Sequence, residues 1–159
     1  MKHPLHQDHI DAQVNAQIKA LNHILELELA GVVKYTHYAL MVFGYHRLPI
    51  VSWFKANAEE GLEHAHKAGE LVTRLGGHPS LKIGELLETA KHDIGAILRE
   101  SLAHERATLM AYYALMKQSE GNSVLLEEHA RAMILAEELH LDAVNKMLRN
   151  PGEIAPFTA

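Results

Sequence analysis

Cysteine is absent from this chain of 159 residues. Its absence excludes disulfides, thiolate-bound zinc, iron–sulfur clusters and thiol nucleophiles. The chain also has no run of about 18 apolar residues, so no membrane-spanning helix is expected. Its first residues lack the apolar segment of a signal peptide, which makes a cytoplasmic location the default expectation. Any metal ion held by this chain would need carboxylate and imidazole ligands.

Basic runs are also missing, because the 15 Lys and Arg are dispersed among 20 Asp and Glu. Nucleic acid is therefore not an expected partner. Glycine and proline interrupt the helical pattern at a few places, namely residues 44–49, 76–80, 121–123 and from 151 onward. Between these breaks run four segments with helical periodicity, at about 11–45, 50–75, 84–119 and 123–149. The pattern predicts one all-α domain over 1–159, with a bundle at about 11–149 and extensions at 1–10 and 150–159.

The connections between these segments indicate the topology. The first and last are short, which predicts two antiparallel helical hairpins. The middle link, at about 76–85, is longer and can run the length of a bundle. We therefore expect an antiparallel four-helix bundle with one long crossover between its second and third helices. Asp8 or Asp11 and Ser123 are the expected N-caps of the first and fourth helices. The tail PGEIAPFTA contains two prolines, so a long fifth helix is not expected.

Three of the four segments carry a glutamate where an apolar residue is expected. Glu28, Glu105 and Glu137 each lie on the apolar stripe of their segment, and His140 flanks the last of them. A buried carboxylate is unfavourable unless it is neutralised, and three at similar heights would repel one another. No Lys or Arg lies on these stripes, so bound metal ions are the best explanation.

The second segment contains Glu63 and His66, a Glu-x-x-His pair like that of Glu137 and His140. A spacing of three residues places both side chains on one helical face. Glu28 precedes Glu63 by 35 residues and Glu105 precedes Glu137 by 32, so the two hairpins repeat one arrangement. This is the pattern of a di-iron or di-manganese carboxylate site in a helix bundle. The broad apolar face of the second segment lies elsewhere and is either core or a subunit interface; it comprises Phe54, Ala58, Ala65, Ala68 and Val72.

The ligand types favour iron. Four carboxylates balance two divalent ions, and histidines are neutral ligands. Zn²⁺ and Mn²⁺ are alternative occupants, but open carboxylate and imidazole ligation of two adjacent ions suits redox-active iron better.

These residues resemble bacterioferritin, within the ferritin-like superfamily. The resemblance extends over about 21–148 and is carried by LNHILELELAGVVKY, EEGLEHAHKAGE, LRESLAHERA and ILAEELHLDA. It implies that Glu63 and Glu137 bridge two irons, that Glu28 and His66 cap one, and that Glu105 and His140 cap the other. It also implies that Tyr35 lies next to the metals, with Tyr112 in the similar position after Glu105. Ordinary core packing is the alternative for both tyrosines.

Two departures from bacterioferritin affect the expected cofactor and assembly. His64 stands where the family has the methionine that binds haem; histidine can also ligate haem iron, so His64 is the candidate haem ligand. The short fifth helix of the twenty-four-subunit shell is missing, which favours a twelve-subunit homo-oligomer. A dimer and a twenty-four-subunit shell are the alternatives.

The leading hypothesis is a ferroxidase that oxidises Fe²⁺ with O₂ or H₂O₂ and stores or detoxifies iron. One alternative is a rubrerythrin-like, peroxide-reducing protein or another di-metal oxidase. Another is a bundle that metal ions stabilise without catalysis.

Overall fold

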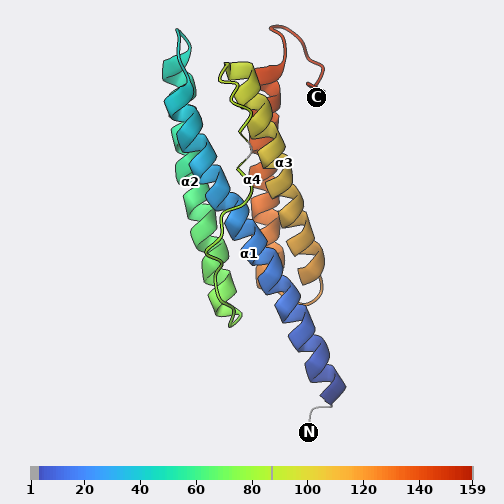
Figure 1. Cartoon of the computed structure of the whole chain (residues 1–159). Coiled ribbons are helices and arrows are strands. Elements are labelled where there is room, and N and C mark those ends of the chain that lie inside the picture. Colours follow the sequence, from blue (N-terminus) through green and yellow to red (C-terminus); the bar gives the residue numbers. More distant parts are fainter. Residues whose placement is uncertain (1–3, 87, 159) are drawn as a thin grey trace.

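The computed structural model describes residues 4–86 and 88–158, with side chains from residue 11 onward. Four helices, α1 (Pro4–Met41), α2 (Arg47–Arg74), α3 (Ile94–Ser119) and α4 (Val124–Leu148), account for most of this part of the chain. They form two antiparallel hairpins, α1–α2 and α3–α4, that lie side by side (Figure 1). The described residues contain no strand and no fifth helix. The predicted four-helix bundle is thus confirmed.

Helix ends follow from local chemistry at several points. The Asp93 carboxylate accepts a hydrogen bond from the Ala96 N–H at 2.9 Å and caps α3. Ser123 caps α4, as the sequence predicts, by accepting from the Leu126 N–H. The first helix begins earlier than predicted, at Pro4, a residue type that the first turn of a helix tolerates well, so the prediction that Asp8 or Asp11 is its N-cap was wrong. Residues 4–10 therefore continue α1.

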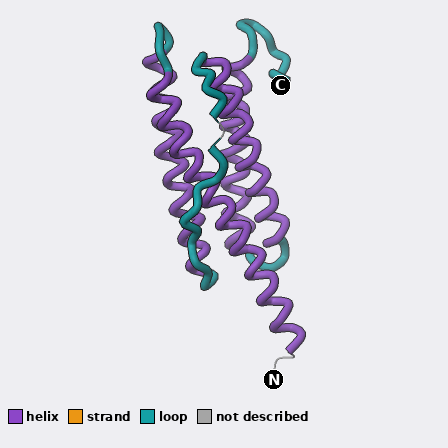
Figure 2. The backbone as a smooth tube through the Cα atoms, in the orientation of Figure 1, coloured by secondary structure: helices purple, strands orange, loops and turns teal. Residues whose placement is uncertain are grey.

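The crossover joins α2 to α3 and runs along the bundle beside α1 (Figure 2). It is fixed to α1 by the side chain of Asn22, which bonds both His78 and Ser80, and by the Gly84 N–H, which donates to the Glu26 carbonyl at 2.8 Å. A Cβ on Gly84 would lie 3.0 Å from that carbonyl oxygen, so only glycine fits there without a shift. The prediction that the third helix begins at Gly84 was wrong: that segment is extended along α1, and α3 begins ten residues later.

The bundle core has two apolar clusters, one toward each end. The first contains Leu21, Ile24, Val72, Leu115 and Leu126, and the second contains Val42, Phe54, Ile97, Leu102 and Val144. Three pairs of helices pack closely, with Cα atoms within 8 Å of each other: α1 with α2, α3 with α4, and α1 with α3. In the described chain, α2 and α4 do not approach each other that closely. Long side chains must therefore span the space between α2 and α4. No helix in the described residues is long and apolar enough to cross a membrane.

Candidate metal centre

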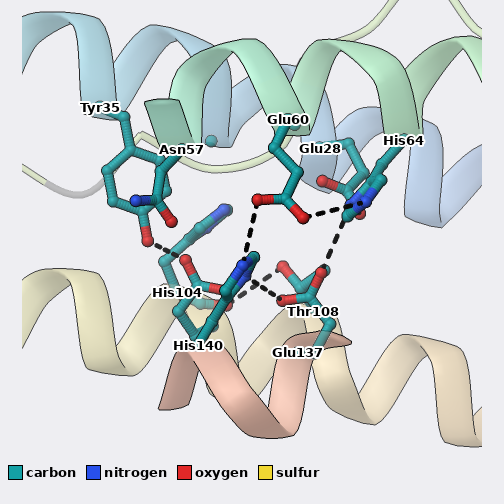
Figure 3. Close-up of a pocket in the computed structure, with 12 residues that line it drawn as sticks. Glu28, Tyr35, Asn57, Glu60, His64, His104, Thr108, Glu137 and His140 are labelled. Atoms are coloured by element: carbon teal, nitrogen blue, oxygen red, sulfur yellow. Dashed lines mark hydrogen bonds and ion pairs between the residues drawn. The ribbon is translucent and has the colours of Figure 1, made fainter. Parts of the chain in front are cut away.

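All four helices contribute ionisable side chains to one internal cavity. Figure 3 shows side chains from opposite helices converging on it. The carboxylates and imidazoles that line it are Glu28 from α1, Glu60 and His64 from α2, His104 and Glu105 from α3, and Glu137 and His140 from α4. The cavity measures about 20 Å³, which is room for about one or two water-sized species. It suits metal ions and a diatomic molecule rather than an organic substrate.

These groups form two triads that share Glu137. In the first, His64 Nδ1 lies 3.4 Å from Glu28 Oε1 and 3.6 Å from Glu137 Oε1. In the second, His140 Nδ1 lies 3.9 Å from Glu105 Oε2 and 3.8 Å from Glu137 Oε2. The ligand atoms of each triad lie within 4.8 Å of one another. Two ligands bound to one ion at about 2.1 Å in tetrahedral geometry would be about 3.4 Å apart. Both triads therefore have dimensions that fit one ion after small movements.

Glu60 lies opposite Glu137, on the other side of the two histidines. Its Oε2 is 3.2 Å from His140 Nε2, and its Oε1 is 3.8 Å from His64 Nε2. The side chain is 43% exposed, so it closes the cavity on the solvent side. Glu60 and Glu137 are thus the two carboxylates that each contact both histidines.

Two tyrosines connect the two hairpins in a reciprocal way. Tyr35, seven residues after Glu28 on α1, donates a hydrogen bond to Glu105 on α3. Tyr112, seven residues after Glu105 on α3, donates to Glu28 Oε1 at 2.7 Å. Both tyrosines are buried. Each therefore orients the carboxylate that belongs to the other hairpin, and both tyrosines lie beside the cluster.

The electrostatics of the cluster show what holds four acidic groups together. Burial disfavours the charge on His64, but hydrogen bonds with Glu137 and Glu28 outweigh it and raise the His64 pKa to about 10. Burial, and then a hydrogen bond to Glu137 and its charge, raise the pKa of Glu105 well above its usual value. Burial also opposes the charge on Glu137, yet hydrogen bonds from His140, His64 and Glu105 hold its pKa below the usual range. Protons on these side chains therefore balance the negative charge of the cluster, a role that bound cations can also fill.

Two further buried groups flank the cluster. Burial, and then the nearby charge of Lys34, lower the pKa of His104 to about 4, so this wall of the cavity carries a neutral imidazole. Lys34 is only 6% exposed, and its own pKa is lowered by burial despite the charges of Glu100 and Glu105. His104 packs so closely on α1 that a Cβ on Gly31 would lie 2.8 Å from its Nε2.

The structure corrects the predicted register of α2. Glu63 and His66 are exposed and do not line the cavity, whereas Glu60 and His64 do. The physical reason is that α2 turns its apolar face inward, and His64 lies on that face next to Ala65 and Ala68, which are buried. A sequence signal for Glu60 exists: it follows Glu28 by 32 residues, the same spacing that separates Glu105 from Glu137.

The rotation of α2 about its axis also bears on the prediction that His64 binds haem. The imidazole is 4% exposed and lies between Glu28 and Glu137 inside the bundle. The cavity of about 20 Å³ that His64 lines is far too small for a haem, so the structure does not support the prediction that His64 binds haem. The apolar face of α2 is core rather than a subunit interface.

Comparisons with known proteins agree with this fold. The ferritin-like domain model of the ferritin family matches residues 18–152. No curated protein matches the chain significantly. A ferritin-like, diiron-carboxylate protein from Bacillus anthracis superposes with a TM-score of 0.82 at 24% identity, covering 86% of this chain and 98% of that one.

Two other solved structures share the fold. Rhodobacter capsulatus bacterioferritin, described with a metal-free dinuclear site and haem iron, has a TM-score of 0.77 at 22% identity, covering 83% of this chain and 82% of its own. A dodecameric thioferritin from Bacteroides fragilis, a bacterioferritin-related protein, has a TM-score of 0.74 at 24% identity and covers 85% of both chains. Because the family model spans most of the sequence and the helices adopt this fold, the chain belongs to the ferritin family, with a ferritin-like four-helix bundle.

Proposed function

We propose that this protein is a ferroxidase that binds two Fe²⁺ ions in the bundle core and oxidises them for iron storage or detoxification. The observation that carries the proposal is the pair of triads sharing Glu137, each with one imidazole nitrogen and one further carboxylate. Carboxylate oxygens and imidazole nitrogens are suitable ligands for divalent iron. Four carboxylates also match the charge of two such ions, and helix bundles with paired carboxylate and histidine ligands are the usual frame of such sites.

Each residue has a distinct role in this proposal. Glu28 and His64 hold one Fe²⁺, and Glu105 and His140 hold the other, while Glu137 lies between them. Glu60 faces the Nε2 atoms of both histidines, on the side away from the triads, so it would orient the two imidazoles as ligands rather than take the bridging position that the resemblance implies for Glu63.

The two tyrosines orient the outer carboxylates. The cavity excludes bulk water, since the carboxylates of Glu28, Glu105 and Glu137 are at most 5% exposed. The two Fe²⁺ substrates together supply the two electrons that reduce O₂ to H₂O₂, or H₂O₂ to water, with protons taken up in the reaction.

The assignment is tested by rapid mixing of Fe²⁺ with the protein in the presence of O₂ or H₂O₂. We expect Glu28→Ala combined with Glu105→Ala to abolish rapid oxidation, because each triad loses one carboxylate. Glu63→Ala is the matched control, since it removes an exposed glutamate of α2 and should keep the wild-type rate. Oxidation at the wild-type rate in the double variant would show that the core cluster is not the site.

Storage requires an assembly, and we propose a hollow homo-oligomer, with twelve subunits favoured. Support comes from large apolar residues exposed on α1 and α2: Val33 at 40%, Leu40 at 65% and Leu62 at 42%. Solution mass measured together with iron content separates the alternatives. Many irons per chain in a large particle indicate storage. Peroxide consumption without iron accumulation would instead indicate a peroxide-reducing protein, and tight Zn²⁺ binding without any oxidation would indicate a metal-stabilised bundle.

A further inference from the structure

A second group of metal-ligating side chains lies outside the bundle core, where the crossover passes α1. It consists of His37 from α1 and Glu88 and His92 from the crossover. His37 Nε2 lies 2.7 Å from Glu88 Oε2, and His92 Nε2 lies 3.6 Å from Glu88 Oε1. The two imidazole rings are 5.9 Å apart. Each oxygen of one carboxylate therefore faces a different imidazole.

We propose that His37, Glu88 and His92 form a second binding site for a divalent transition-metal ion, separate from the core cluster and open to solvent. Two imidazoles and one carboxylate are a ligand set suited to Zn²⁺ or Fe²⁺, with the remaining positions left to water. The three ligand atoms lie within 4.8 Å of one another. The three side chains are 34–45% exposed, so the site opens to solution, although the His37 ring has to turn slightly to present its buried Nε2 atom to an ion.

The geometry of His37 supports a ligand role over a simple ion pair. Its Nε2 atom is buried and has no hydrogen-bond partner among the described residues, although a Glu88 oxygen lies close by. The ring nitrogen and the carboxylate are thus near each other without the alignment of a hydrogen bond. An ion bound by both atoms would use both lone pairs, after the atoms separate from 2.7 Å to the roughly 3.4 Å expected for two ligands of one ion. A cavity of about 210 Å³ beside His37, Tyr38 and Glu88 leaves space for its water ligands.

The crossover is held in place around this group. The Ala90 N–H donates to Glu88 Oε1 at 2.6 Å, and Ala90 has a φ of +56°, which is uncommon for a residue with a side chain. The Thr89 N–H and hydroxyl donate to Glu100 on α3, whose second oxygen accepts from the Tyr38 hydroxyl at 2.8 Å. These contacts fix Glu88 against α1 without using the ligand atoms of the two histidines.

One cation, Lys34, lines the same cavity and would repel a metal ion. Its charge is offset by the nearby carboxylates of Glu100 and Glu85, both of which interact with it. With Glu88 supplying a further negative charge, the surroundings of the proposed site remain favourable to a divalent cation.

The test measures Zn²⁺ binding by calorimetry in a background of Glu28→Ala and Glu105→Ala, which weakens the core sites. This background should keep one Zn²⁺ per chain at the surface site. Adding His37→Ala or His92→Ala should weaken that binding by on the order of tenfold or more, since each removes a direct ligand. The matched control is His78→Ala, an exposed histidine elsewhere on the crossover, which should change nothing.

A second measurement locates the ion. Zn²⁺ should slow amide hydrogen exchange of residues 88–92 in the background protein, because the ion ties the crossover to α1. Unchanged Zn²⁺ affinity in both histidine variants, or no protection of residues 88–92, would overturn the proposal. In the protein with an intact core, His37→Ala should abolish binding at this site and leave the rate of Fe²⁺ oxidation unchanged, so a failure of this proposal and a failure of the proposed ferroxidase function are separate results.

Discussion

The register of α2 is open to a direct test with two histidines that are two residues apart. His64→Ala removes an imidazole that is 4% exposed and lies between the carboxylates of Glu28 and Glu137. Without metal, this substitution leaves two buried carboxylates facing each other. Because a buried charge then loses its partner, the free energy of unfolding should fall by up to about 3–5 kcal/mol. His66→Ala removes an exposed side chain, so its effect on stability should be within about 0.5 kcal/mol.

The same pair of variants should differ in metal binding. Loss of a residue that only orients a ligand already costs about 10–100-fold in affinity. Loss of the His64 ligand should therefore weaken the binding of one core ion by about 100-fold or more, while His66→Ala keeps the wild-type affinity. Calorimetric titration with Zn²⁺ measures the affinities, and urea denaturation of the metal-free proteins measures the stabilities.

A second substitution guards against a folding defect. His64→Gln keeps a hydrogen-bonding side chain between the two carboxylates but offers a poorer metal ligand, so it should fold and still bind the ion weakly. The reasoning would be refuted if His66→Ala reduced metal affinity as much as His64→Ala does. It would also be refuted if His64→Gln folded normally and bound metal like the wild type.

Three further outcomes are expected. Tyr112→Phe removes the hydrogen bond to Glu28 and should lower the free energy of unfolding by about 1.5–3 kcal/mol, as measured by urea denaturation; no change would mean that water replaces the hydroxyl. Zn²⁺ at 100 times its Kd should stabilise the metal-free protein by about 2.7 kcal/mol per site, seen as a rise in Tm; an unchanged Tm would argue against any site. Gly84→Ala should destabilise the protein, because the new Cβ would lie 3.0 Å from the Glu26 carbonyl oxygen. Gly69→Ala on α2 is the contrasting variant: its Cβ meets no atom within 4 Å, so it should stabilise the protein by about 0.5–1 kcal/mol. Thermal melts that rank the two variants in the opposite order would contradict this packing.

The course of the crossover is a feature that helical periodicity cannot predict. Residues 84–93 have no strong helix breaker except Gly84, so the pattern extends the third helix back to that residue. The structure places this segment along α1, where Gly84 bonds the Glu26 carbonyl and Asp93 caps α3. Contacts between distant parts of the chain outweigh local helix propensity here. The grouping of His37 with Glu88 and His92 depends on this course and has no signal in the sequence spacing.

The four helices, the two hairpins and the inward direction of three glutamates follow from the sequence pattern alone. Glu28, Glu105 and Glu137 lie on long apolar stripes, and burying such a stripe forces the carboxylate inward whatever the neighbouring helices are. Their convergence at one height also follows from the repeat between the hairpins.

Packing between the helices selects the α2 residues that complete the cluster. The inward face of α2 combines Phe54 and Val72 with three alanines, and in the sequence this face suits a subunit interface as well as it suits the core. The packing of α2 on α1 settles the rotation of the helix, because it buries the alanines and turns Glu63 and His66 to solvent. That rotation brings Glu60 and His64 to the space that Glu137 and His140 enter from α4.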